Sequence, residues 1–114
     1  SCFSSDRLPR VVAAELAEPA VVDAVALAVS APVGRAPNDY RLELRSGGVW
    51  RSALIGSERR ASLGAARELW TLTLAQPIAV ESVRIVRQRE GRVSVVDELS
   101  LLHDGRPYVW LWNL

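Results

Sequence analysis

The chain has 114 residues and a hydrophobic fraction of 49%, which suits a single domain, predicted to span residues 1–114. Its 14 basic and 13 acidic residues give a formal net charge of +1, which argues against a nucleic-acid partner. No apolar run reaches the roughly 18 residues of a membrane-spanning helix, so we expect no membrane span.

Cys2 is the single cysteine in the sequence, which excludes an internal disulfide. Two interpretations of the Ser-Cys start remain open. Cys2 is either the lipidated residue left by a bacterial lipoprotein cleavage, or a thiol without a special role.

Two strands are predicted at the start, over Arg10–Leu16 and Ala20–Val29, because both are rich in β-branched valine. Pro19 separates them, since proline lacks the N–H that a strand ladder or a helix needs. Alanine on the other face leaves a helical alternative open for residues 11–29. Ser30–Asn38 is predicted as a loop.

A hairpin is predicted over Asp39–Ile55. Apolar and charged side chains alternate along Tyr40–Arg45, the period of a strand with one buried and one solvated face. Ser46-Gly47-Gly48 follows, and glycine makes the tight turn inexpensive. Trp50 begins the second strand and is predicted to pack in the core.

Gly56–Arg67 is polar and is predicted to be a long loop. Glu68–Ala75 alternates again and forms a strand with Trp70 in the core, ended by Gln76-Pro77. Ile78–Gln88 is a further strand. Its apolar phase changes at Ser82, which predicts a β-bulge there.

The last predicted elements are a strand over Val93–Leu102, a turn over His103–Pro107 and a strand over Tyr108–Leu114. Trp110 and Trp112 on this final strand either cover the core or form an exposed binding strip. Together the pattern of about eight short strands predicts an all-β, jelly-roll-like antiparallel β-sandwich.

Three segments carry a family resemblance: Leu16–Leu27, with a strand, a proline and a second strand; the Tyr40–Trp50 hairpin; and Pro77–Ile85 followed by Val96–Leu101. In this order they resemble the discoidin, or coagulation-factor C-type, domains of the galactose-binding-like jelly-roll superfamily. The likeness covers about residues 11–105 and implies a discoidin-like β-sandwich.

The resemblance implies sugar contacts in the loop before Tyr40, where Arg35, Asn38 and Asp39 lie. Guanidinium and amide groups suit vicinal sugar hydroxyls, because they offer paired donors and acceptors. The alternative is that Asn38-Asp39 only caps a turn. Small basic patches could flank the sugar or form a solvated rim. Their members proposed for ligand contact are Arg59, Arg60 and Arg87.

Glu98 matches the position of a structural-calcium ligand in the resembled family. Calcium needs six or more oxygen ligands, and the family's others come from an N-terminal segment with no counterpart here. A Glu98 ion pair with a partner such as Arg84 is therefore the alternative.

Enzyme chemistry has little support, since the sequence lacks a nucleophile elbow, a P-loop and a Cys/His metal cluster. The resemblance implies a non-catalytic carbohydrate-binding accessory module, extracytoplasmic, which works beside a parent or partner enzyme domain on a glycan or cell-envelope polysaccharide. The first alternative is a structural or protein-interaction domain that docks through its Trp-rich C-terminal strand. The weakest is a small hydrolase that uses His103, the single histidine.

Overall fold

The computed structural model describes residues 11–30, 40–88, 95–107 and 111–113, and all elements in this part are antiparallel β-strands, eight in number. The predicted all-β antiparallel sandwich of about eight strands is confirmed. The strands are β1 (Val11–Ser30), β2 (Tyr40–Ser46), β3 (Val49–Ser52), β4 (Ile55–Gly64), β5 (Arg67–Arg87), β6 (Val95–His103), β7 (Arg106–Pro107) and β8 (Leu111–Asn113).

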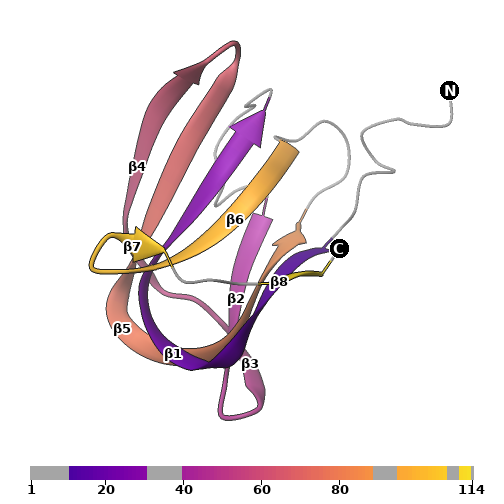
Figure 1. The fold of residues 1–114 in the computed structure, drawn as a ribbon, viewed down its shortest axis with the longest axis vertical. Helices are drawn as coiled ribbons and strands as arrows, with labels where there is room; N and C mark the ends of the chain where they lie inside the picture. The colour runs from indigo at the N-terminus through magenta and orange to yellow at the C-terminus, as the bar shows by residue number, and fades with distance from the viewer. Residues whose placement is uncertain (1–10, 31–39, 89–94, 108–110, 114) are drawn as a thin grey trace, which may run out of the picture.

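Two long strands, β1 and β5, run through both layers of the sandwich and bend together between them (Figure 1). In the first layer the order is β4-β5-β1-β6-β7, built on the first half of β5 and the second half of β1. In the second layer it is β3-β2-β5-β1-β8, built on the other halves. The layers are therefore two arms of one continuous sheet.

The bend coincides with two irregularities in the β1–β5 pairing. Between Glu15 and Ala20, residues 16–19 of β1 face a single residue of β5. Beyond Val22, residues 74–77 of β5 face a single residue of β1. Each of these segments contains a proline, which cannot donate to the ladder and is tolerated at a bulge. The prediction that Pro19 and Pro77 end separate strands is therefore wrong.

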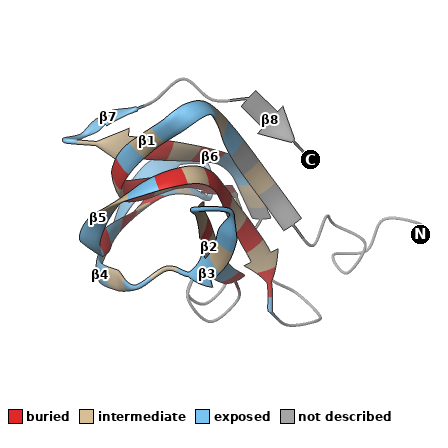
Figure 2. Cartoon of the chain, turned by 90° about the horizontal axis from the view of Figure 1, so that it is seen from below, coloured by how far each residue is buried: buried red, intermediate tan, exposed pale blue. Residues whose placement is uncertain are grey.

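The core lies between the layers, and its members come from β1, β2, β5 and β6. In Figure 2 the buried segments fall on these central strands, while β3, β4 and β7 are largely exposed. The predicted phase change at Ser82 is confirmed, since Ser82 and the next residue, Val83, are both buried. The buried core residues are Val22, Val25, Leu27, Val29, Tyr40, Leu42, Leu44, Trp70, Leu72, Leu74, Val80, Val83, Ile85, Leu99 and Leu101.

The predicted hairpin is confirmed as β2 and β3, with Gly47 and Gly48 in the left-handed region at φ +60° and +77°. The prediction for Trp50 is wrong, because its side chain is only half-buried and lies outside the core cluster. A two-residue turn places Trp50 directly opposite Arg45, and opposite residues share a face of the sheet. Trp50 therefore lies on the charged outer face.

The predicted loop over Gly56–Arg67 is also wrong, since Ile55–Gly64 forms β4. This strand shows no apolar alternation because it is exposed along most of its length and is held by backbone pairing with β5. With the first half of β5 it forms a hairpin arm, whose tip is the turn at Ala65-Ala66 (Figure 1).

The C-terminal predictions are tested in part. The Val93–Leu102 strand corresponds to β6, and the His103–Pro107 turn is centred on Asp104-Gly105, with β7 after it. The backbone of β8 pairs with residues 13–15 of β1. Cys2, Trp110 and the side chain of Trp112 lie outside what the structure describes.

Candidate functional site

A hollow of about 220 Å³, here called the first hollow, lies between the layers beside Tyr40. Buried lining residues from both layers, such as Leu27, Leu72 and Ile85, give it an apolar floor. Its exposed polar lining residues are Arg41, Ser52 and Gln88. Apolar walls with a few convergent polar groups are typical of small-molecule sites.

The loop that holds Arg35, Asn38 and Asp39 lies outside the described residues, but both of its attachment points are described. Ser30 pairs with the start of β5 in the first layer. Tyr40 pairs with the end of β5 in the second layer and lines the first hollow. Residues 31–39, which include the three predicted sugar ligands, therefore connect Ser30 of the first layer to Tyr40, a lining residue of the first hollow.

Arg59 and Arg60 do not line the first hollow, which β4 reaches only with its first residue, Ile55. Arg59 is exposed and lies opposite Thr71. Arg60 covers the ring of Trp70, with its Cζ 4.3 Å from the ring centroid, and its Nη2 donates to Glu68 Oε1 at 2.7 Å. Arg60 therefore belongs to a packed side-chain cluster.

Glu68 accepts a second hydrogen bond at 2.7 Å, from the indole Nε1 of Trp70. The bond from Trp70 and that from Arg60 favour the carboxylate and hold the pKa of Glu68 below its usual 4.5. Trp70 is fully buried, which confirms the prediction that it is a core residue. Its one polar atom, the indole nitrogen, is hydrogen-bonded to Glu68.

Arg87 was predicted to contact a ligand or else to lie in a solvated rim, and the rim alternative is wrong because Arg87 is buried. Its exposed fraction is 5%, and it lies opposite Tyr40 in the β2–β5 pairing. Its place on the inward parity follows from the phase change at Ser82, after which the odd-numbered residues of β5 face the core. A ligand in solvent has no direct access to it.

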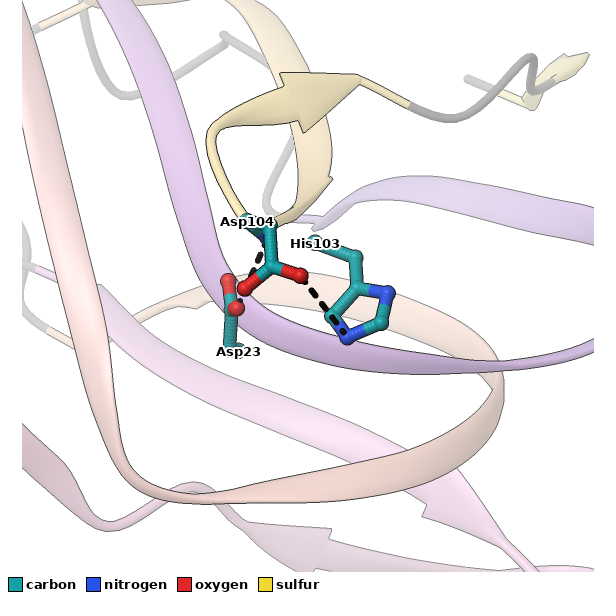
Figure 3. Close-up of side chains that lie close together, drawn as sticks. All are labelled: Asp23, His103 and Asp104. Atoms are coloured by element: carbon teal, nitrogen blue, oxygen red, sulfur yellow. Dashed lines mark hydrogen bonds and ion pairs between the residues drawn. The ribbon is translucent and has the colours of Figure 1, made fainter.

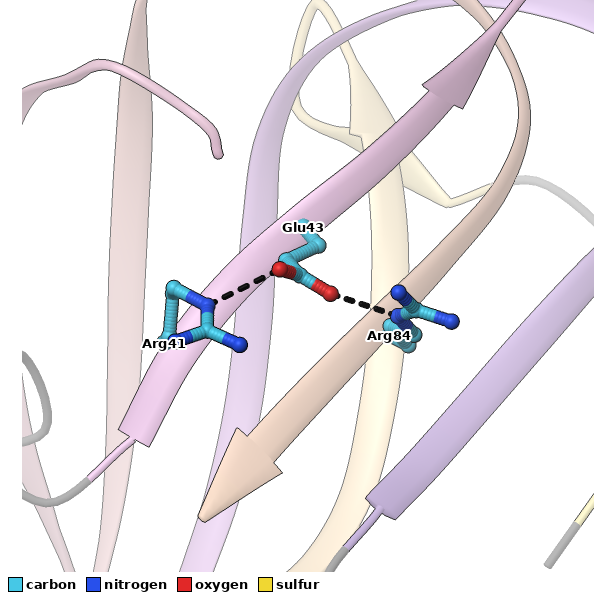
Figure 4. Close-up of polar contacts among 3 residues, drawn as sticks. All are labelled: Arg41, Glu43 and Arg84. Carbon is cyan, nitrogen blue, oxygen red and sulfur yellow. Dashed lines mark hydrogen bonds and ion pairs between the residues drawn. The ribbon is translucent and has the colours of Figure 1, made fainter. Parts of the chain in front are cut away.

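The outer face of the second layer carries a charged cluster in which Glu43 lies between two arginines (Figure 4). Glu43 accepts from Arg84 Nε at 2.6 Å and from Arg41 Nε at 2.8 Å. The bond from Arg84, the larger cause, and that from Arg41 hold the pKa of Glu43 below its usual 4.5, although burial opposes them. The guanidinium of Arg84 also stacks on Trp50, 3.9 Å from its ring centroid.

Arg84 therefore pairs with Glu43 and not with Glu98, because Glu43 is its direct cross-strand neighbour. Glu98 is exposed on β6 and belongs to no group of candidate metal ligands in the described part of the chain. The predicted calcium site at Glu98 stays a prediction.

One group of candidate metal ligands is present among the described residues, formed by Asp23, His103 and Asp104 (Figure 3). Their ligand atoms lie within 4.8 Å of one another, and the backbone N–H of Asp104 donates to Asp23 Oδ2 at 2.8 Å. Two carboxylates and an imidazole are donors for a divalent transition ion and are too few for calcium. Asp23 lies close to His103 and Asp104 because β1 pairs with β6, and this pairing places Ala24 opposite Leu102.

Sequence patterns gave no signal for Arg41, Ser52 and Gln88 as a group. They come from three separate segments, which lie side by side only because β2 pairs with both β3 and the end of β5. No protein-family model matches the chain, and no curated protein or solved structure matches it. In the ranges that the structure describes, there is no helix of the length and apolar character needed to cross a bilayer.

Proposed function

We propose that this chain is a non-catalytic carbohydrate-binding module that recognises a glycan at the loop end of its sandwich. The observation that supports this most is the first hollow, which has an apolar floor and includes the polar residues Ser52 and Gln88 in its lining. It lies where the segment with Arg35 and Asn38 enters the second layer at Tyr40.

The lining suits the chemistry of a sugar. The C–H surface of a pyranose ring packs on apolar side chains, while its hydroxyls need donors and acceptors such as those of Gln88 and Ser52. The hollow is smaller than the about 300–1,000 Å³ of drug-sized pockets, which favours one terminal sugar residue over a longer segment.

The setting of the module is also part of the proposal. The resemblance to discoidin domains supports an accessory role beside a parent or partner enzyme domain. It also supports an extracytoplasmic location, where a glycan or cell-envelope polysaccharide would be the ligand. In this role the module binds and positions the glycan without making or breaking bonds.

The test is a titration with a panel of monosaccharides and short oligosaccharides, followed by backbone amide NMR. We expect saturable shifts around Tyr40 and Gln88. Gln88→Ala and Asn38→Ala should each weaken binding about tenfold, the loss for one hydrogen bond to a bound hydroxyl. Ser57→Ala, on the exposed edge strand β4, is the matched control and should leave the affinity unchanged. Saturable binding that neither Gln88→Ala nor Asn38→Ala weakens would contradict the proposal, as would the lack of any sugar response.

A further inference from the structure

A second hollow, of about 420 Å³, lies where β5 bends, next to the β2–β3 hairpin. One side is formed by residues 74–78, which include the segment of β5 that bulges opposite β1. The other side is formed by residues 51–54, which lead from β3 toward β4. Its volume falls in the about 300–1,000 Å³ range of small-molecule pockets.

The lining of the second hollow is mainly apolar, and it includes Leu44, Leu54, Leu74, Pro77 and Ile78. Leu54 is 78% exposed, more than any other large apolar side chain in the described ranges. A single exposed leucine is ordinary, but this one borders an apolar hollow, where a bound chain would cover it.

The charged lining of this hollow is positive. Arg51 lines it and no carboxylate does, as far as the described residues show. Arg51 lies opposite Leu44 in the β2–β3 pairing, so its side chain is on the hairpin face that is turned toward the hollow. Arg41, Arg45 and Arg84 on the same hairpin and its neighbour all pair with glutamates, whereas Arg51 forms no ion pair with a described residue.

We propose that the second hollow binds a small anionic amphiphile, an aliphatic carboxylate of medium chain length. The chain packs on Leu74, Ile78 and Leu54, and the carboxylate accepts hydrogen bonds from the guanidinium of Arg51. Charge complementarity selects the anion, because an arginine presents paired donors that match a carboxylate. The apolar lining selects the aliphatic chain.

The test is a titration of the full chain with sodium decanoate below its micellar concentration, with 1-decanol as the neutral probe of the same chain length. We expect saturable decanoate binding with the largest amide shifts at Leu54 and Ile78. Arg51→Ala should weaken decanoate about tenfold, the effect of losing a charge-assisted hydrogen bond, and should leave decanol within about twofold. Leu54→Ala should weaken both probes.

Two controls separate this inference from its alternatives. Arg59→Ala removes an equal charge from exposed β4 and should leave decanoate binding unchanged. Gln88→Ala alters the first hollow and should also leave it unchanged. The inference is overturned if decanoate does not saturate, if Arg51→Ala and Arg59→Ala weaken it equally, or if Gln88→Ala abolishes it. The sugar titration is independent, so either proposal can fail alone.

Discussion

Two side-chain clusters use the same three residue types, one on the inner face of the first layer and one on the outer face of the second. The inner cluster is Arg60, Glu68 and Trp70 in the hairpin arm, and the outer cluster is Glu43, Trp50 and Arg84 on the second layer. In both, a guanidinium stacks on the tryptophan ring and donates to the glutamate, at ring distances of 4.3 Å in the inner and 3.9 Å in the outer cluster.

The clusters differ in which side chain is covered by its neighbour and so shielded from solvent. Trp70 is fully buried opposite Leu27 of β1, so Arg60 covers a core ring. Trp50 is half-buried opposite Arg45, and there the ring covers the ion pair of Arg84. The same contact therefore closes the core in one place and supports a solvated face in the other. The strand face, and not the residue types, decides its energetic role.

The largest expected difference between the clusters is the loss of each tryptophan. Trp70→Ala should lower the free energy of unfolding by about 3–5 kcal/mol, because it opens a cavity in the core. Trp50→Ala should lower it by about 1 kcal/mol, since a surface cation–π contact is lost. Urea unfolding at pH 7 measures both, with Trp70→Phe as a milder variant. Equal losses would show that the two tryptophans are not used differently.

Acid titration gives a smaller effect. The pKa of Glu43 is lowered in the folded protein, so the stabilisation is complete above the unfolded value of 4.5 and is lost as pH falls through the folded value. Glu43→Gln should lower stability by about 1 kcal/mol at pH 7 and by almost nothing near pH 2. Unfolding at both pH values measures this. A deficit that persists in acid would mean that Glu43 acts through packing and not through its charge.

Removal of the inner guanidinium should have the smallest effect. Arg60→Ala should cost about 0.5–1 kcal/mol, the size of a cation–π contact near the surface. It should also speed hydrogen exchange of the Trp70 indole N–H, which Arg60 and Glu68 now shelter. NMR of the indole signal measures the exchange. Unchanged protection would show that the arm shields Trp70 without Arg60.

The success of the hairpin prediction and the failure for β4 have one cause. Alternation over Tyr40–Arg45 reports a strand with one buried and one wet face, and Gly47-Gly48 supplies the turn. The edge strand β4 is exposed to solvent along most of its length, so its sequence shows no such alternation. The alternation does not determine the face of Trp50, because that face depends on the turn length, which sets the register.

Sugar binding at the segment before Tyr40 stays a prediction, because residues 31–39 lie outside the described part of the chain. The sequence marks that segment by its prolines, Arg35 and Asn38, and the next residue, Tyr40, lines the first hollow. Arg87 was misplaced because a phase change on a long strand decides which side chains are buried. Gln88 was not recognised, since a single glutamine after a strand carries no pattern of its own.

The sequence alone determined that this chain forms antiparallel strands around a β core, because period-two alternation, β-branched residues and glycine turns act over a few neighbouring positions. Only the tertiary structure decided that Pro19 and Pro77 bend two continuous strands, that Glu43 rather than Glu98 pairs with Arg84, and that two hollows lie between the layers. These features depend on which distant segments pair and in which register, and no local pattern contains that information.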